Sequence, residues 1–135
     1  MSDSLVLDSF ALLALLRDEQ GAGVVRDLLT RAAQGEIALL MSEINLGEVV
    51  YQTERKYGAD EAAETLVAIE ALPIRMVEVT RARVLAASHL KANHRISYAD
   101  AFAAALAQEY GASVVTGDPE FRSLGEKVSV EWLGR

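Results

Sequence analysis

The chain contains no cysteine, which excludes disulfide bonds, thiol catalysis and thiolate zinc sites. It has only His89 and His94 as histidines, too few for a histidine-based zinc centre, and we expect both at helix ends or on the surface. No uninterrupted apolar run is longer than Phe10 to Leu16, which is too short to cross a bilayer. No basic residue precedes that run, unlike in a secretory signal, so we expect a soluble cytoplasmic protein.

Positive charge is also scarce. The 13 Lys and Arg residues against 20 Asp and Glu residues give a net charge of −7. Phosphate binding usually depends on surplus Lys and Arg, so this balance argues against a nucleic-acid-binding protein unless several of the acids hold metal ions.

Apolar residues, in contrast, make up 51% of the 135 residues. No low-complexity tract or disordered tail is visible. A chain of this length and composition can bury one hydrophobic core, so we expect residues 1–135 to form a single domain.

Short apolar runs typical of strands alternate with longer helical patterns. We expect strands at 5–7, 37–41, 74–79, 113–116 and 128–132, and helices at 9–17, 23–33, 43–57, 60–72, 80–93 and 98–110. This alternation predicts an α/β fold whose parallel sheet is covered by helices on both faces. Functional residues of such folds lie beyond the carboxyl ends of the strands.

Asp8 and Asp118 stand just beyond strand ends. Asp8 directly follows the strand at 5–7, and Asp118 follows the strand that ends at Thr116. Both also suit a purely structural role, because Asp is a favoured N-cap and Pro119 fits the first position of a helix. The position at one sheet edge and the capping role are compatible.

Glu48 and Asp100 are expected on helices. Glu48 suits an ordinary surface position on an amphipathic helix, but its neighbours Gly47, Val49 and Val50 are uncharged, which is unusual for a solvated helix face. Asp100 opens a helix that is apolar almost all round and should be buried, so its carboxylate is partly desolvated. Ser97 and Asp100 also have the spacing of a capping box, with Asp in place of Glu.

Together the four acids indicate a cation site. Two carboxylates ~4 Å apart at an effective dielectric of ~20 repel by roughly 4 kcal/mol, so a cluster needs protons or cations. Oxygen-only ligands suit Mg²⁺ or Mn²⁺, and two such ions would neutralise the four acids. Divalent ions polarise phosphates and activate water, which favours phosphodiester hydrolysis.

Four segments resemble PIN-domain nucleases, in particular the toxin components of VapBC toxin–antitoxin pairs, with matching order and spacing over almost the whole chain. They are Leu-Val-Leu-Asp-Ser at 5–9, Ser-Glu-Ile-Asn-Leu-Gly-Glu at 42–48, Ser-Tyr-Ala-Asp-Ala-Phe at 97–102 and Thr-Gly-Asp-Pro-Glu-Phe at 116–121. The resemblance implies a Rossmann-like three-layer α/β/α fold with four or five parallel strands. It also implies a Mg²⁺- or Mn²⁺-dependent endoribonuclease.

The resemblance further assigns roles to individual residues. It implies that Asp8, Glu48, Asp100 and Asp118 are the metal ligands and catalytic acids, with Thr116 as a supporting catalytic residue and Ser9 or Asn45 assisting. It implies hydrolysis by activated water, with 5′-phosphate and 3′-hydroxyl products. A VapB-like antitoxin and a homodimer are the implied partners. Candidate contacts to RNA phosphates are Arg17, Lys91, Arg95 and Arg122.

Other functions remain open from the sequence. A phosphoacceptor receiver module also has acids at strand ends, but Asp8 lacks an adjacent acid and no lysine follows the fourth strand. A haloacid-dehalogenase-like phosphatase would need paired aspartates, which Asp8-Ser9-Phe10 does not supply. A non-catalytic PIN-like interaction domain is the third alternative, and the presence of all four acids argues against it.

Overall fold

The computed structural model describes residues 3–134, and the strands and helices lie close to where the sequence predicts them. In chain order they are β1 (Asp3–Leu7), α1 (Ser9–Leu16), α2 (Ala22–Ala33), β2 (Ile37–Ser42), α3 (Glu43–Tyr57), α4 (Ala59–Glu70), β3 (Arg75–Val77), α5 (Arg81–Asn93), α6 (Tyr98–Tyr110), β4 (Ser113–Thr116), the 3₁₀ segment η1 (Pro119–Lys127) and β5 (Val130–Trp132). Two expected strands are shorter than the sequence indicates: β3 lacks 74, 78 and 79, and β5 lacks 128 and 129. No described helix is long and apolar enough to cross a membrane.

The five strands form one parallel sheet in the order β3-β2-β1-β4-β5. This confirms the predicted α/β fold with a parallel sheet. The chain builds outward from β1 to β3, then crosses back to place β4 on the other side of β1. The strand order therefore reverses between β1 and β4, and ligand sites of open α/β sheets lie at that point.

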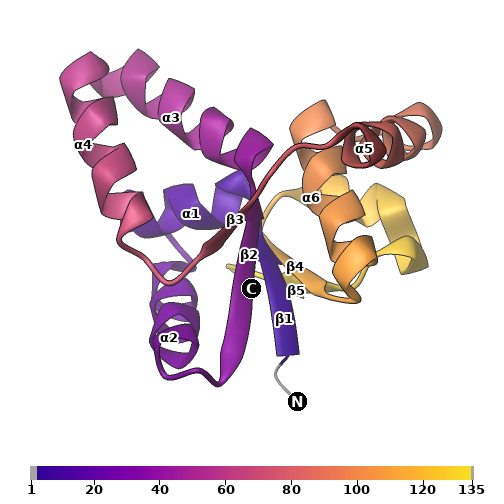
Figure 1. The fold of residues 1–135 in the computed structure, drawn as a ribbon, viewed down its shortest axis with the longest axis horizontal. Helices are drawn as coiled ribbons and strands as arrows, with labels where there is room; N and C mark the ends of the chain where they lie inside the picture. The colour runs from indigo at the N-terminus through magenta and orange to yellow at the C-terminus, as the bar shows by residue number, and fades with distance from the viewer. Residues whose placement is uncertain (1–2, 135) are drawn as a thin grey trace.

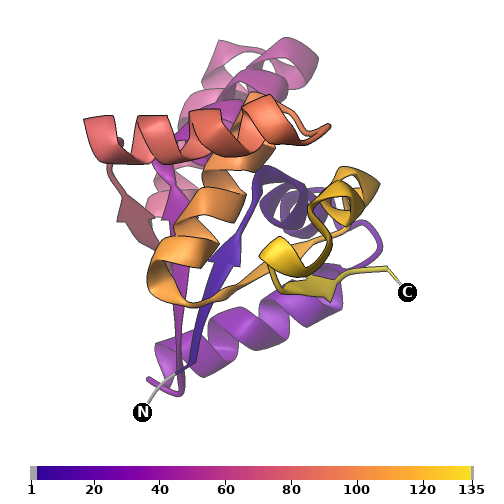
Figure 2. The same cartoon turned by 90° about the vertical axis from the view of Figure 1, so that its right-hand side faces the viewer.

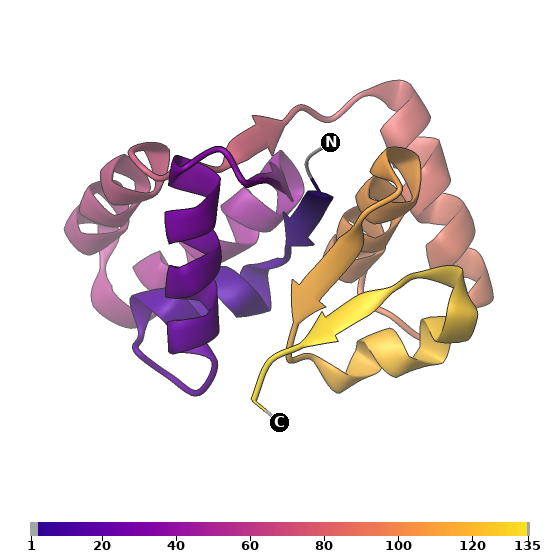
Figure 3. The same ribbon diagram turned by 90° about the horizontal axis from the view of Figure 1, so that it is seen from below.

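Helices cover both faces of the sheet, as Figures 1 and 3 show. Side chains alternate along each strand, so Val6 and Val114 pack with α5 and α6, while Leu7 and Val115 pack with α1 and α2 on the other face. Figure 2 shows α5 crossing α6, with η1 beside them. The three-layer α/β/α arrangement predicted from the sequence is confirmed.

Helix α6 is buried over most of its length, as its composition predicts. All residues from Asp100 to Ala107 are buried, and the run of alanines allows close approach to the sheet. Helix α3 extends from the end of β2 and contacts α6 near the carboxyl ends of the strands. These two helices bring Glu48 and Asp100 to the same end of the molecule as Asp8 and Thr116.

Candidate metal centre

Asp8 lies at the point where the strand order reverses, fully buried just beyond β1. Its Oδ1 accepts a hydrogen bond from the backbone N–H of Ala11 at 2.9 Å, which makes it the N-cap of α1. Its Oδ2 accepts a hydrogen bond from the hydroxyl of Thr116 at 2.5 Å, across the boundary between β1 and β4. The capping role and the position at the sheet edge therefore occur together.

Thr116 connects Asp8 to Asp118. While its hydroxyl donates to Asp8, the same oxygen accepts a hydrogen bond from the backbone N–H of Asp118 at 3.0 Å. Asp118 in turn caps η1, since its Oδ1 accepts from the N–H of Glu120 at 2.9 Å and Pro119 occupies the first helical position. One buried hydroxyl thus fixes both strand-end acids.

Asp100 lies in the first turn of α6 with only 4% of its surface exposed. Ser97 caps this helix, and its hydroxyl accepts from the Asp100 N–H at 3.1 Å. The predicted Ser97 half of the capping box is confirmed, but Asp100 does not accept from the Ser97 N–H in return, so that half of the prediction is wrong. Glu120 Oε1 instead accepts from the Ser97 N–H at 3.2 Å. The Asp100 carboxylate does not cap the helix, and its buried Oδ2 has no hydrogen-bond partner among residues 3–134.

Glu120 joins the acids that the sequence singled out. Carboxylate oxygens of Asp100, Asp118 and Glu120 lie within 4.8 Å of one another, close enough to share one cation. Glu120 is not among the acids predicted from the sequence, because an acid in the first turn of a helix is common. Its place two residues after Asp118, inside the Thr-Gly-Asp-Pro-Glu-Phe segment, is the only sequence signal that marks it.

Glu48 faces the other acids from α3. It lines a cavity of about 430 Å³ together with Asp100, Asp118 and Glu120, but it is not one of the three acids whose oxygens lie within 4.8 Å. The Ser9 hydroxyl donates a hydrogen bond to Glu48 Oε1. Asn45, which also belongs to α3, is fully buried. Its side-chain amide donates a hydrogen bond to the Ala99 carbonyl at 3.1 Å and so links α3 to α6.

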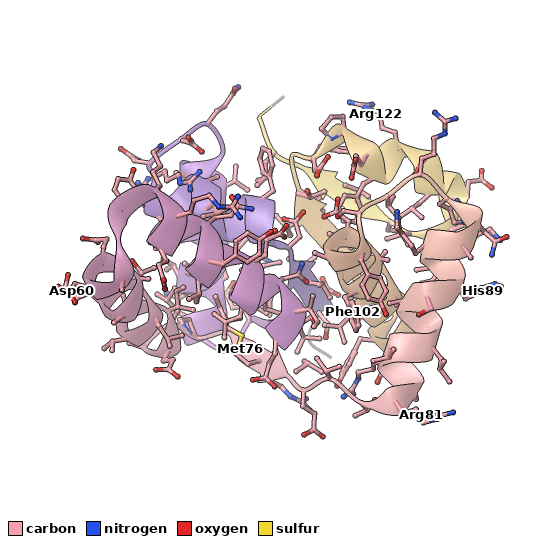
Figure 4. All side chains as sticks on the ribbon, turned by 90° about the horizontal axis from the view of Figure 1, so that it is seen from above. Asp60, Met76, Arg81, His89, Phe102 and Arg122 are labelled. Atoms are coloured by element: carbon pink, nitrogen blue, oxygen red, sulfur yellow. The ribbon has the colours of Figure 1, made fainter. Side chains whose placement is uncertain are left out.

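The electrostatics of this end of the sheet favour a bound proton or cation. Burial raises the pKa of Asp8 from 3.8 to about 7, against the lowering effect of its hydrogen bonds from Thr116 and Ala11. Burial also raises the pKa of Asp100 from 3.8 to about 9, and the neighbouring carboxylate of Asp118 raises it further. Figure 4 looks onto this end, with α1, α3 and α4 on one side and α5, α6 and η1 on the other.

The sequence matches the PIN domain family over residues 5–127, a span that includes every residue of this cluster. The chain belongs to the PIN-domain family. No curated protein matches the sequence. The PIN fold is nevertheless well represented among solved structures, and several similar ones are VapC toxins or VapBC complexes.

Three of these structures illustrate the likeness. VapBC2 from Rickettsia felis bound to a promoter DNA fragment has a TM-score of 0.75 at 14% identity, covering 97% of this chain and 99% of that one. DNA-bound VapBC from Salmonella typhimurium has a TM-score of 0.73 at 15% identity, with 97% and 98% covered. VapC20 from Mycobacterium tuberculosis, described as a Sarcin-Ricin loop cleaving toxin, has a TM-score of 0.70 at 20% identity, with 91% and 95% covered.

The PIN topology sets aside the receiver alternative. Receiver domains have the strand order 2-1-3-4-5, whereas here β1 is central in the order β3-β2-β1-β4-β5. Of the four basic residues named as RNA contacts, Arg17 lines the acidic cavity of this PIN domain. Arg122 instead lies over the ring of Trp132 at 4.7 Å, and Lys91 and Arg95 are exposed.

Proposed function

We propose that this PIN domain is a Mg²⁺- or Mn²⁺-dependent endoribonuclease, a VapC-type toxin in which residues 1–135 form one domain. The single observation that carries the proposal is the cluster of Asp100, Asp118 and Glu120 oxygens within 4.8 Å, in which the buried Asp100 Oδ2 has no hydrogen-bond partner in the described part of the chain. An unpaired buried carboxylate oxygen among other acids is costly without a proton or a cation, and a divalent cation would satisfy all three acids at once. The donors are all hard oxygens, so Mg²⁺ or Mn²⁺ fits them.

In this proposal, Asp8, Glu48, Asp100 and Asp118 hold the metal, and Glu120 is a further candidate ligand. A bound divalent ion would supply a Lewis acid for the phosphate and an activated water for hydrolysis. Thr116 orients Asp8 and Asp118 through its hydroxyl, and Ser9 orients Glu48. The substrate is RNA, cut to leave a 5′-phosphate and a 3′-hydroxyl.

We also propose a VapB-like antitoxin as the protein partner and a homodimer as the assembly. The support for the antitoxin comes from related structures that are themselves complexes, such as a toxin–antitoxin complex from Klebsiella pneumoniae with a TM-score of 0.65 at 14% identity, covering 94% of this chain and 95% of that one. The acidic cavity between α1, α3 and α6 would receive a basic side chain from an amphipathic antitoxin helix.

The decisive experiment is cleavage of a labelled, structured RNA pool by purified, antitoxin-free protein with Mg²⁺, with Mn²⁺ and with EDTA. We expect cleavage only with metal and none by Asp8→Ala. Glu126→Gln, a change of an exposed acid at the end of η1, serves as the matched control and should cut normally.

Metal binding gives a readout that does not depend on finding the right RNA. Mn²⁺ should raise the Tm of the wild type and of Glu126→Gln, and should do so less for Asp118→Asn. Folded protein that binds Mn²⁺ yet cuts no RNA in the pool would overturn the nuclease proposal in favour of a non-catalytic interaction domain.

A further inference from the structure

Phe10 is an exposed aromatic residue at the edge of the acidic cavity. The residues around it in α1, from Ser9 to Ala14, are otherwise buried, yet 41% of the Phe10 surface is exposed. The ring lines the same cavity as Glu48, Asp100 and Asp118. It therefore lies beside the carboxylates and faces solvent instead of filling the core.

The ring of Phe10 rests directly on the backbone of Gly117, between Thr116 and Asp118. A Cβ at position 117 would lie 2.3 Å from Cε1 and 2.6 Å from Cζ of the ring, so only glycine leaves room for it there. The φ angle of Gly117 is not in the left-handed region, so its backbone does not itself require glycine. Glycine at position 117 therefore serves to leave space for the Phe10 ring.

Arg17, the C-cap of α1, places a positive charge at the same cavity. Phe10, Leu13 and Arg17 follow one another at spacings of three and four, and all three line the acidic cavity. An aromatic face and a guanidinium beside a cation-binding site are the two groups that recognise single-stranded nucleic acid, by stacking on bases and by pairing with phosphates. Because the net charge of the chain is negative, RNA binding has to depend on local groups such as these and not on the overall charge.

We propose that Phe10 stacks on an unpaired base next to the phosphate that is cut, so that the enzyme selects single-stranded RNA at this position. The proposal rests on the proposed ribonuclease function and adds the residue that determines substrate class. Stacking on an aromatic ring contributes similarly for every base, so Phe10 selects unpaired structure more than sequence. A base inside a duplex has both faces covered and cannot reach the ring.

The first test combines a protein variant with a modified RNA. Phe10→Leu keeps an apolar contact with Gly117 but removes the aromatic face, and should lower kcat/KM on single-stranded RNA on the order of tenfold. A single abasic nucleotide at the stacked position should cost the wild type as much. The two changes together should cost little more than either alone, because both remove one interaction. Additive losses at every abasic position would overturn the proposal.

Two further variants separate stacking from general damage. Phe10→Trp should cut at least as well as the wild type, since it keeps an aromatic face. Tyr110→Leu is the matched control: Tyr110 ends α6 and lines a different cavity, at the amino ends of β1 and β2. It should leave kcat/KM unchanged.

Gly117→Ala tests the contact between the Phe10 ring and the backbone of residue 117 without changing Phe10 itself. Its Cβ would displace the ring, so kcat/KM should fall as for Phe10→Leu, and Gly117→Ala with Phe10→Leu should be no worse than either. Unchanged Mn²⁺ affinity would show that Asp118 has not moved. Full activity of Gly117→Ala on single-stranded RNA would contradict the proposal.

Binding can be followed without cleavage, which distinguishes failure of this proposal from failure of the nuclease function. In EDTA at low salt, single-stranded RNAs that each carry one 2-aminopurine, at successive positions, are mixed with the protein. The wild type should quench the fluorescence at one of these positions, and Phe10→Leu should not. If the wild type cuts no RNA but quenches, stacking holds and the proposed activity fails. If it cuts RNA without Phe10-dependent quenching, the activity holds and stacking is wrong.

A loss of antitoxin binding alone in Phe10→Leu would assign the ring to the protein partner instead, against the proposal.

Discussion

At the residue scale, Asp8 and Asp118 each cap a helix and also make a second contact within the site. Asp8 caps α1 and accepts from Thr116, while Asp118 caps η1 with one oxygen and contributes to the acidic cluster. An N-cap needs only one carboxylate oxygen, so capping fixes the side chain and leaves the second oxygen for another contact. In Asp8 that second contact is the Thr116 hydroxyl.

Asp100→Asn tests the repulsion within the cluster. We expect this change to stabilise the metal-free protein at neutral pH by roughly 1–2 kcal/mol, because Asp100 must take up a proton to be buried beside Asp118 and Glu120, whereas Asn is neutral in the unfolded chain as well. The Ser97 cap survives, since Ser97 Oγ accepts from the backbone N–H of residue 100. RNA cleavage should be abolished. Urea unfolding in EDTA is the measurement, with the exposed Asp27→Asn as a control; equal or lower stability would contradict the clustered-carboxylate argument.

Thr116→Val tests the hydroxyl that links Asp8 and Asp118. The change keeps the shape of the side chain but leaves the buried Asp8 Oδ2 without a donor, at a cost of about 1–3 kcal/mol in the free energy of unfolding. The pKa of Asp8 should rise further, because the lost hydrogen bond favours its charged form. The pH–rate profile should therefore shift to higher pH. Thr116→Ser should restore it, and a profile shared by all three proteins would refute this role.

At the scale of elements, the start of α6 and the start of η1 form one unit. Glu120 accepts from the Ser97 N–H and also belongs to the acidic cluster with Asp100 and Asp118. The segment after β4 therefore completes the cap of a helix that precedes β4 in the chain. This contact couples the position of η1 to that of Asp100.

Glu120→Gln separates the two contributions of this residue. The amide oxygen of Gln can still accept from Ser97, so the free energy of unfolding should change by less than about 0.5 kcal/mol. Mn²⁺ affinity should fall about tenfold, as expected for a lost or weakened metal contact. Isothermal titration calorimetry with Mn²⁺ measures this, with Glu126→Gln as control. Unchanged affinity would leave Glu120 with a capping role only.

At the scale of the whole molecule, the buried acids couple stability to pH and metal. The pKa values of Asp8, about 7, and Asp100, about 9, both lie above the usual 3.8, so the folded protein binds protons more tightly than the unfolded chain. Stability from these protons is fully present below pH 3.8 and is lost as pH rises through 7 and 9, at about 1.4 kcal/mol per pKa unit.

The Tm in EDTA should therefore fall between pH 5 and pH 9, and Mn²⁺ should raise it most at high pH, where it competes with the fewest protons. Thermal unfolding with and without Mn²⁺ at several pH values is the measurement. In Asp100→Asn the decline in EDTA should be smaller. A Tm in EDTA that is constant or rises over this range would show that these acids are not held protonated.

The sequence was sufficient to predict the fold because the signals involved are local. Strand residues such as Leu5 to Leu7 are apolar on both faces, and the helices α3, α5 and α6 begin at the capping residues Ser42, Thr80 and Ser97. The ends of β3 were less predictable, since pairing with β2 and not composition limits that strand.

By itself the sequence determined the parallel α/β fold and placed Asp8, Asp118 and Thr116 at the strand ends, because strand periodicity and caps depend on neighbours along the chain. Only the tertiary structure decided which acids share one cavity, that Glu120 replaces Asp100 in the cap of α6, and that Phe10 rests on Gly117. These features depend on contacts between residues far apart in sequence. A displacement of a few ångströms decides whether an acid contacts the other carboxylates or faces solvent, and local sequence patterns do not encode it.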